Sequence, residues 1–335
     1  IEAFLYNNEE PNPDKVGDVP VIKLDAGEFC TEYPVYIGTR GIYHEQIAET
    51  LGGLGFEKIQ PVDVDLDMWL RNAYLEKHFA DIGREFLKIG DLKAVEEGTS
   101  AAIYVAKSIH DAPLKQKYQE KPYEKLIQVG AALTGTHLPD CLLADDTGDN
   151  ISTKNGQFCE LTALYWIWKN RLQYPAANEK YEYYGLSHYR RILELTEDDV
   201  LRLVDNEVDV VLPYPMPYEP DMEEHHKRYL KQEDWNAVRK AILEMTPEYA
   251  KDFSKILKQK YFYNYNMVLA KKDVLEEYCN WLFPVLERVE ELSSPKGEER
   301  ADRYVGYIGE SLLTLYFMYQ KGKLNIMHTG CRFLT

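Results

Sequence analysis

The chain has 335 residues, with 39 Lys and Arg against 56 Asp and Glu, which gives a formal net charge of -17 at pH 7. This charge opposes binding to nucleic acid, so no nucleic-acid partner is expected. The length predicts two domains, because single hydrophobic cores stop growing at about 250 to 300 residues. Five scattered cysteines without metal-binding spacing, and the lack of an apolar run of about 20 residues, favour a reduced cytoplasmic protein.

The first part of the chain alternates short apolar strands with helices. Strands are predicted at 1–8, 20–24, 33–39 and 57–62, and a helix at 45–55, which is an α/β pattern with parallel pairing. It resembles the later half of a Rossmann-like domain, although Tyr6-Asn7-Asn8 follows no Gly-rich phosphate-binding turn. The sequence begins at Ile1, inside a predicted strand. This leaves open whether the first elements of this domain are missing from it.

A helical region at 67–90 and a polar stretch with Gly98 to Ser100 come next, so we place the domain boundary near residue 98. The predicted domains are therefore residues 1–98, Rossmann-like, and 99–335. The second begins with a buried-type strand at 101–108, followed by a polar loop at 142–156, a buried helix at 158–170 and a strand at 181–191. Further strands are predicted at 207–215 and 261–270, and helices at 233–245, 247–259, 272–292 and 299–322.

Five ordered motifs in the second domain carry a resemblance to a known family. They read TGDNIS, CELTALYWIWKN, GLSHYRR, YNYNMVLAKKDVLEEYCNWLF and YVGYIGESLL. Together they resemble the bacterial capsular and exopolysaccharide biosynthesis family long described as a domain of unknown function and regarded as glycosyltransferases. The resemblance covers residues 101 to about 320 and implies a GT-A-like α/β fold. Ile192-Leu193 and Glu310-Ser311-Leu312 depart from its pattern.

The resemblance also implies a substrate class. The expected donor is a nucleotide sugar, most simply a UDP-sugar, with UDP-galactofuranose suggested by family association. The expected acceptor is a hydroxyl of a surface polysaccharide or a lipid-linked glycan, with peripheral association to the membrane assembly machinery. No cofactor is predicted, and a divalent metal is compatible with the site but not required.

The stretch Ser187-His188-Tyr189-Arg190-Arg191 stands where GT-A enzymes commonly carry metal-binding carboxylates. Guanidinium groups bind phosphate oxygens bidentately and stay protonated, so we predict that Arg190 and Arg191 replace the metal at the donor diphosphate. His188 is a second candidate ligand. The alternative is that the arginines pair with Asp198 and Asp199, and strand alternation would turn one of them into the core.

The loop before the buried helix is dense in carboxylates. Asp145, Asp146, Asp149 and Asn150 are candidates to bind sugar or ribose hydroxyls or a metal, with Asp149 also a second candidate base. The alternative is an Asx-rich turn that caps the next helix. Glu160, at the start of that helix, is equally well interpreted as a paired core carboxylate or as a site residue.

Asn264 and Asn266 alternate with aromatic residues in YFYNYNMVLA, so both are predicted to lie on one face of a strand and to bind substrate hydroxyls. Ordinary edge-strand polarity is the alternative, above all for Asn264.

Glu310 lies on the last long helix, away from the apolar stripe that contains Ile308 and Leu312. A carboxylate among apolar neighbours has its proton affinity raised by desolvation, which suits a general base for an acceptor hydroxyl. Exposure to solvent is the alternative.

These patterns together predict a glycosyltransferase with Glu310 as base and the arginines at the leaving diphosphate. A non-catalytic protein that binds a sugar nucleotide or glycan is the alternative from another class. A nucleotide-dependent enzyme that uses the first domain is disfavoured by the missing glycine-rich turn.

Overall fold

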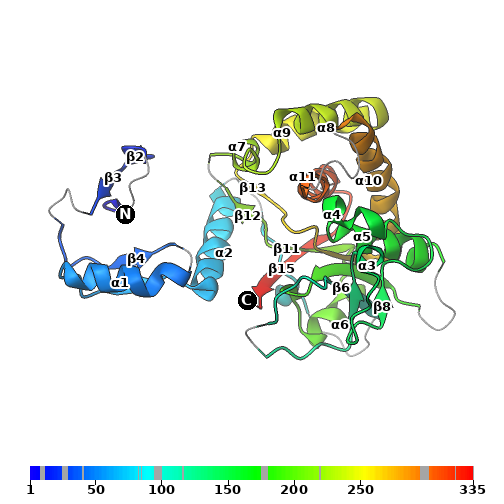
Figure 1. Ribbon diagram of the computed structural model, residues 1–335, viewed down its shortest axis with the longest axis horizontal. Helices are drawn as coiled ribbons and strands as arrows, with labels where there is room; N and C mark the ends of the chain where they lie inside the picture. Colours follow the sequence, from blue (N-terminus) through cyan, green and yellow to red (C-terminus); the bar gives the residue numbers. More distant parts are fainter. Residues whose placement is uncertain are drawn as a thin grey trace. The chain divides into compact units, whose positions relative to one another are not determined.

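The computed structural model describes the chain except residues 8–11, 25–28, 40, 82, 84, 94–99, 115–116, 175–179, 219, 295–301, 321 and 335. The chain forms two compact units, Ile1–Leu70 and Arg71–Thr335 (Figure 1). This division comes earlier than the boundary expected near residue 98. The reason is that Leu75 and Phe79 pack with Tyr261 of the second unit, and Lys88 pairs with His328. Gly98 of the expected linker lies outside the described residues.

The described part of the first unit contains two small sheets and helix α1, and α2 (Val64–Asp81) begins at its end. Its elements are β1 (Phe4–Tyr6), β2 (Lys15–Val16), β3 (Val19–Lys23), β4 (Val35–Ile37), η1 (Gly41–Tyr43), α1 (His44–Gly53) and β5 (Ile59–Pro61). The parallel pairing predicted from the pattern is found between β1 and β3 and between β4 and β5. Ile37, Leu51 and Phe56 form its buried core. The Rossmann-like assignment stays a prediction, and Asn8 lies outside the described residues.

The second unit is built on a mixed eight-stranded sheet in the order β10-β15-β11-β14-β9-β6-β7-β8. These strands are β6 (Ala101–Lys107), β7 (Glu124–Gln128), β8 (Leu143–Ala144), β9 (Tyr183–His188), β10 (Arg191–Glu194), β11 (Val210–Pro213), β14 (Val268–Lys271) and β15 (Ile326–Phe333), and a separate pair joins β12 (Met216–Pro217) to β13 (Tyr261–Phe262). Strands β9, β6, β7 and β8 are parallel, whereas β14 is antiparallel to β9 and β11. The predicted α/β class is confirmed in this mixed form.

Helices surround this sheet. They are α2 (Val64–Asp81), η2 (Ile89–Asp91), α3 (Ala131–Thr134), η3 (Ser152–Lys154), α4 (Asn155–Phe158), α5 (Leu161–Ile167), the π-helical turn η4 (Trp168–Leu172), α6 (Glu197–Asp205), α7 (Met222–His226), α8 (Gln232–Met245), η5 (Pro247–Tyr249), α9 (Ala250–Leu257), α10 (Lys272–Leu292) and α11 (Tyr304–Tyr319). No helix among the described residues is long and apolar enough to cross a membrane.

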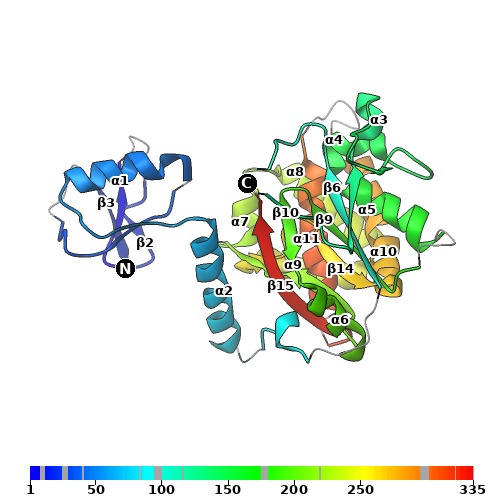
Figure 2. The same cartoon turned by 90° about the horizontal axis from the view of Figure 1, so that it is seen from below.

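The main core lies between one face of the sheet and helices α5, α8, α9, α10 and α11. Strand alternation sends Ala102, Tyr104 and Ala106 of β6 into this core. Figures 1 and 2 show these helices together on one side of the strands, with α6 on the other side. Helix α6 begins where the Thr196 side chain and Asp199 form a reciprocal cap.

Two predicted elements are interrupted, and both interruptions shape one region of the molecule. The helix expected at 158–170 breaks at Cys159, whose φ of 52° leaves the helical range. The strand expected at 261–270 breaks at Tyr265 and Asn266, with φ of 69° and 51°. These breaks lie where the carboxyl end of β9 meets the chain entering β14.

Candidate active site

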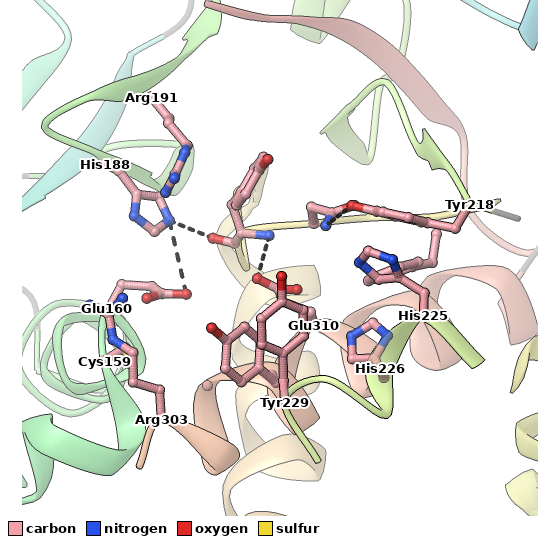
Figure 3. Close-up of a pocket in the computed structure, with 15 residues that line it drawn as sticks. Cys159, Glu160, His188, Arg191, Tyr218, His225, His226, Tyr229, Arg303 and Glu310 are labelled. Atoms are coloured by element: carbon pink, nitrogen blue, oxygen red, sulfur yellow. Dashed lines mark hydrogen bonds and ion pairs between the residues drawn. The ribbon is translucent and has the colours of Figure 1, made fainter. Parts of the chain in front are cut away.

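A cleft of about 300 Å³ opens beside the end of β9 and the first half of α11 (Figure 3). It is lined by Cys159, Glu160, His188, Arg191, Tyr218, His225, His226, Tyr229, Phe262, Asn264, Tyr265, Arg303, Gly306, Tyr307 and Glu310. Of the predicted site residues, His188, Arg191, Asn264 and Glu310 are therefore brought together.

A tight hairpin places His188 and Arg191 on the same side. His188 ends β9 and pairs with Arg191, which begins β10, so only Tyr189 and Arg190 form the turn. Residues paired directly across two antiparallel strands project to the same face. Arg190 lies outside the cleft lining. Of the two predicted arginines, the structure thus brings only Arg191 into the site, because the chain turns where a continuous strand was expected.

Arg191 is a partly buried cation that forms no ion pair with any described carboxylate. Its guanidinium carbon lies 4.4 Å from the centre of the Tyr265 ring, and its Nε has no hydrogen-bond partner within the described structure. The alternative pairing with Asp199 is not formed, because Asp199 pairs with Arg202 and caps α6. Arg191 is thereby left available to an anionic ligand in the cleft.

The strained segment at Tyr265 is held by its neighbours. The His188 ring donates from Nε2 to the Tyr265 carbonyl at 2.6 Å, and the Tyr265 amide donates to Glu310 Oε1 at 2.9 Å. Left-handed backbone at a non-glycine residue costs about 1 to 3 kcal/mol and persists only where surrounding contacts impose it. This segment therefore fixes the distance between the imidazole and the Glu310 carboxyl.

Glu310 is 8% exposed, so the solvent-exposed alternative is wrong. The cleft around it also contains the charged residues Glu160, Arg191 and Arg303, so its setting is not purely apolar. Burial, together with the charge of Glu160, raises its pKa to about 8, although the Tyr265 amide, Arg191 and Arg303 lower it. A carboxyl with this proton affinity exchanges its proton near neutral pH, as a general base must.

Glu160 is a cleft residue with a buried partner behind it. Its Oε1 accepts a 2.6 Å hydrogen bond from Asn266 Nδ2, and the same amide reaches the Gly306 carbonyl at 3.1 Å. Asn266 is fully buried and outside the lining. The prediction that Asn266 shares a strand face with Asn264 is therefore wrong, because the left-handed residues end the alternation. The Asn266 amide instead positions Glu160 from behind the cleft.

Three further groups of lining residues were not singled out from the sequence. Arg303 precedes α11 and lies beside Cys159 and Glu160, which raise its pKa above the ordinary value.

His225 and His226 end α7, and Tyr218, Tyr229 and Tyr307 surround them. The only sequence signal was the HH pair between tyrosines in YEPDMEEHHKRY, which has no strand or helix period of its own.

The carboxylate loop lies outside the cleft lining. Asp145 is fully buried and accepts hydrogen bonds from the Gly130 and Ala131 amides and from two hydroxyls, those of Ser152 and Thr162. Its role as a ligand-binding residue is thus corrected to a structural one, because all of its neighbours are protein donors.

The rest of the loop has local partners as well. Asp146 faces His137 at 2.9 Å, and Asp149 accepts from the Tyr165 hydroxyl at 3.2 Å. Asn150 accepts from the Ser152 amide two residues on, which is the Asx turn of the alternative interpretation. Within the described part of the chain, no group of three or more His, Cys, Asp or Glu side chains is arranged to hold a metal ion.

Residues 105–321 match the model of a family described as a domain of unknown function, DUF4422. The chain belongs to this family. Every residue that lines the cleft falls inside the matched region. No curated protein sequence matches the chain significantly.

Two solved structures are similar to the chain. The apo structure of the WbbM bifunctional glycosyltransferase aligns with a TM-score of 0.58 and 27% identity over 70% of this chain. The chain spans 45% of the WbbM chain, less than half of its length. The mannosyltransferase Ktr4p from S. cerevisiae aligns with a TM-score of 0.34 and 11% identity, covering 78% of this chain and 79% of Ktr4p.

Proposed function

We propose that this protein is a glycosyltransferase that moves a sugar from a nucleotide diphosphate sugar to a hydroxyl of a glycan acceptor. The observation that carries the proposal is the cleft itself, where Arg191 is left without a carboxylate partner and faces the buried acid Glu310. The similarity to WbbM, a glycosyltransferase, supports the same reaction class. A GT-A-like fold for residues from about 99 onward belongs to this proposal.

Arg191 would bind the donor diphosphate, with His188 and Arg303 beside it. Charge-assisted hydrogen bonds to phosphate are among the stronger polar contacts, and they strengthen as negative charge collects on the leaving group. Arg191 begins β10, just after the end of β9, the place where GT-A enzymes commonly carry metal-binding carboxylates. We therefore propose that a divalent metal is not essential, and that donor affinity survives a chelator.

Glu310 would act on the acceptor. The acceptor oxygen gives its proton to the Glu310 carboxylate and bonds to the anomeric carbon of the donor sugar. The bond from that carbon to the β-phosphate oxygen breaks, and its electron pair leaves with the diphosphate. The raised pKa of Glu310, about 8, allows the proton to be accepted close to neutral pH.

Glu160 has a supporting role toward both His188 and Glu310. Its carboxyl lies 3.9 Å from His188 Nε2 and is held by Asn266. We assign it to the positioning of His188 and to the electrostatic balance of Glu310, whose pKa it raises. The carboxylate loop at 145–150 receives no catalytic role in this scheme.

The finer features of the substrate follow the family resemblance. UDP-sugars, including UDP-galactofuranose, are the proposed donors. A surface polysaccharide or lipid-linked glycan is the proposed acceptor, met in the cytoplasm at the membrane assembly machinery.

The experiment is release of nucleoside diphosphate from a panel of sugar nucleotides, measured with and without glycan acceptors and with and without EDTA. Turnover of at least one UDP-sugar by the wild-type protein, retained in EDTA, is expected. Tight UDP binding without turnover of any donor would favour the non-catalytic binding protein instead. Loss of UDP binding in EDTA would reject the metal-independent scheme.

A further inference from the structure

The cleft has two chemically different walls, which Figure 3 shows on either side of Glu310. One wall carries the side chains His188, Arg191, Glu160 and Arg303. The other, here called the aromatic wall, consists of Tyr218, His225, His226, Tyr229, Phe262, Asn264 and Tyr307. The proposed diphosphate site uses only the first wall, so the aromatic wall has no role in it.

The aromatic wall contains one closely stacked pair of rings that neighbouring rings support. Tyr229 and Tyr307 stack with their ring centres 4.5 Å apart and planes 19° apart. Tyr229 also contacts both histidine rings, and the Tyr218 ring lies 3.8 Å from that of His225. Tyr229 remains 42% exposed. An exposed ring fixed by packing on one face offers its other surface to a ligand at low entropic cost.

A polar group without a partner lies on the same wall. Asn264 is 7% exposed, and its Nδ2 donates to the Tyr218 hydroxyl at 2.7 Å. Its Oδ1 has no hydrogen-bond partner in the described structure. Buried polar atoms are nearly always paired, so an orphaned acceptor at a cleft indicates a donor that arrives with a ligand.

The wall is electrically neutral at pH 7. Burial lowers the pKa of His226 to about 4, although its Nδ1 contacts the Met222 carbonyl at 3.0 Å. Burial also lowers the pKa of His225, with the charge of Arg228 as a further cause. Neutral imidazoles, phenols and an amide offer no positive charge to a phosphate, but they match a molecule that combines apolar C–H faces with hydroxyl groups.

We propose that the aromatic wall is the subsite for a neutral hexopyranose unit of the acceptor glycan, stacked on Tyr229 and hydrogen-bonded to Asn264. This inference rests on the proposed function, because it places the acceptor hydroxyl next to Glu310 and opposite the diphosphate. Ring stacking and hydrogen bonds to hydroxyl groups define the class of ligand. The acceptor and the donor are then recognised by different walls of one cleft.

The test uses a panel of methyl α- and β-hexopyranosides, which carry no aromatic group of their own, and their binding to the full chain is measured by saturation-transfer NMR in the presence of UDP. Wild-type protein should bind at least one glycoside. Tyr229→Ala should raise its dissociation constant about ten-fold, whereas Tyr229→Phe should change it by less than about three-fold. Tyr174→Ala, which removes another exposed tyrosine outside the lining, is the matched control.

UDP affinity is measured on the same samples and should be unchanged in Tyr229→Ala. The proposal is overturned if no glycoside binds the wild-type protein, if Tyr229→Ala binds it equally well, or if Tyr229→Ala weakens UDP as strongly as the sugar. Failure of the proposed function looks different. In that case the glycoside binds and depends on Tyr229, while no sugar nucleotide is turned over.

Discussion

The residues of the cleft fall into two groups. Some are proposed to contact a ligand, and others hold these contacting residues in position. Arg191 and Arg190 are neighbours in sequence, yet the two-residue turn directs only Arg191 into the cleft. They are therefore a natural pair of variants, with equal loss of charge and different expected consequences.

We expect Arg191→Ala to weaken UDP binding by about ten- to a hundred-fold, the range for losing charge-assisted hydrogen bonds to a phosphate. Arg190→Ala should stay within about three-fold of the wild-type affinity, since Arg190 lies outside the cleft lining and acts on a bound diphosphate only through a solvent-screened charge. Isothermal titration with UDP measures both. Equal effects of the two substitutions would show that the diphosphate does not bind at Arg191.

The pH dependence of turnover should report Glu310. Its folded-state pKa is raised to about 8, and a base works in its deprotonated form. The value of kcat/KM should therefore rise with pH, reach half of its maximum near pH 8 and level off above about pH 9, along one ionisation of the free enzyme. A rate profile recorded in buffers of constant ionic strength checks this. A profile that is flat from pH 6 to 9 would argue against Glu310 as the base.

At the scale of elements, the close approach of α11 to α5 depends on a glycine. A Cβ on Gly309 would lie 2.6 Å from Leu161 Cδ1 and 2.9 Å from Asn266 Oδ1. Gly309→Ala should thus displace Asn266 and with it Glu160, and lower the free energy of unfolding by about 1 to 3 kcal/mol.

Gly156→Ala is the control, because nothing lies within 4 Å of the Cβ that it would add in α4. Urea unfolding of both variants, with donor turnover measured alongside, checks the prediction. If Gly309→Ala kept the stability and the turnover of the wild type, the close packing of α11 against α5 would not depend on this glycine.

Asp145 links the loop before α3 to η3 and α5 through four hydrogen bonds. Asp145→Asn replaces one acceptor oxygen with a donor, so we expect a loss of about 2 to 4 kcal/mol in the free energy of unfolding. UDP affinity of the folded protein should be retained. Asp149→Asn, at an exposed carboxyl, should unfold like the wild type. A loss of UDP affinity in a stable Asp145→Asn protein would restore Asp145 as a site residue.

The sequence pattern predicted some of these elements well and others poorly, for physical reasons. Helix α10 was predicted at 272–292 and is observed at Lys272–Leu292, because its apolar period is continuous. Strand β15, Ile326–Phe333, was not predicted, since His328, Thr329 and Gly330 obscure its apolar character. Positive φ angles at Cys159, Tyr265 and Asn266 are imposed by tertiary contacts and could not be read from local alternation.

The same limit applies to the site. Glu310 and Arg191 were singled out because each stands in a recognisable motif with an unusual neighbour pattern, and the structure places both in the cleft. Tyr229 and Arg303 reach the cleft from segments without such a pattern, and His225 had only the HH pair as a signal. Packing brings these residues together.

At the scale of the whole molecule, the two compact units have separate cores. Every residue that lines the cleft belongs to the second unit. We expect the first unit to act as a scaffold or docking domain. A chain that begins at Asp63, before α2, should fold and retain UDP affinity within about three-fold, because it keeps every proposed phosphate contact. A folded chain of this length with no UDP affinity would place part of the nucleotide site in the first unit.

The central claim is that this cleft transfers a sugar with Glu310 as the base, and the most direct test is the turnover of Glu310→Gln on the donor and acceptor that the wild-type protein uses. The substitution keeps the shape of the side chain and an oxygen for the Tyr265 amide. We expect a kcat lower by about two to four orders of magnitude, with UDP affinity within about two-fold of the wild type. Near-normal transfer by Glu310→Gln would contradict it.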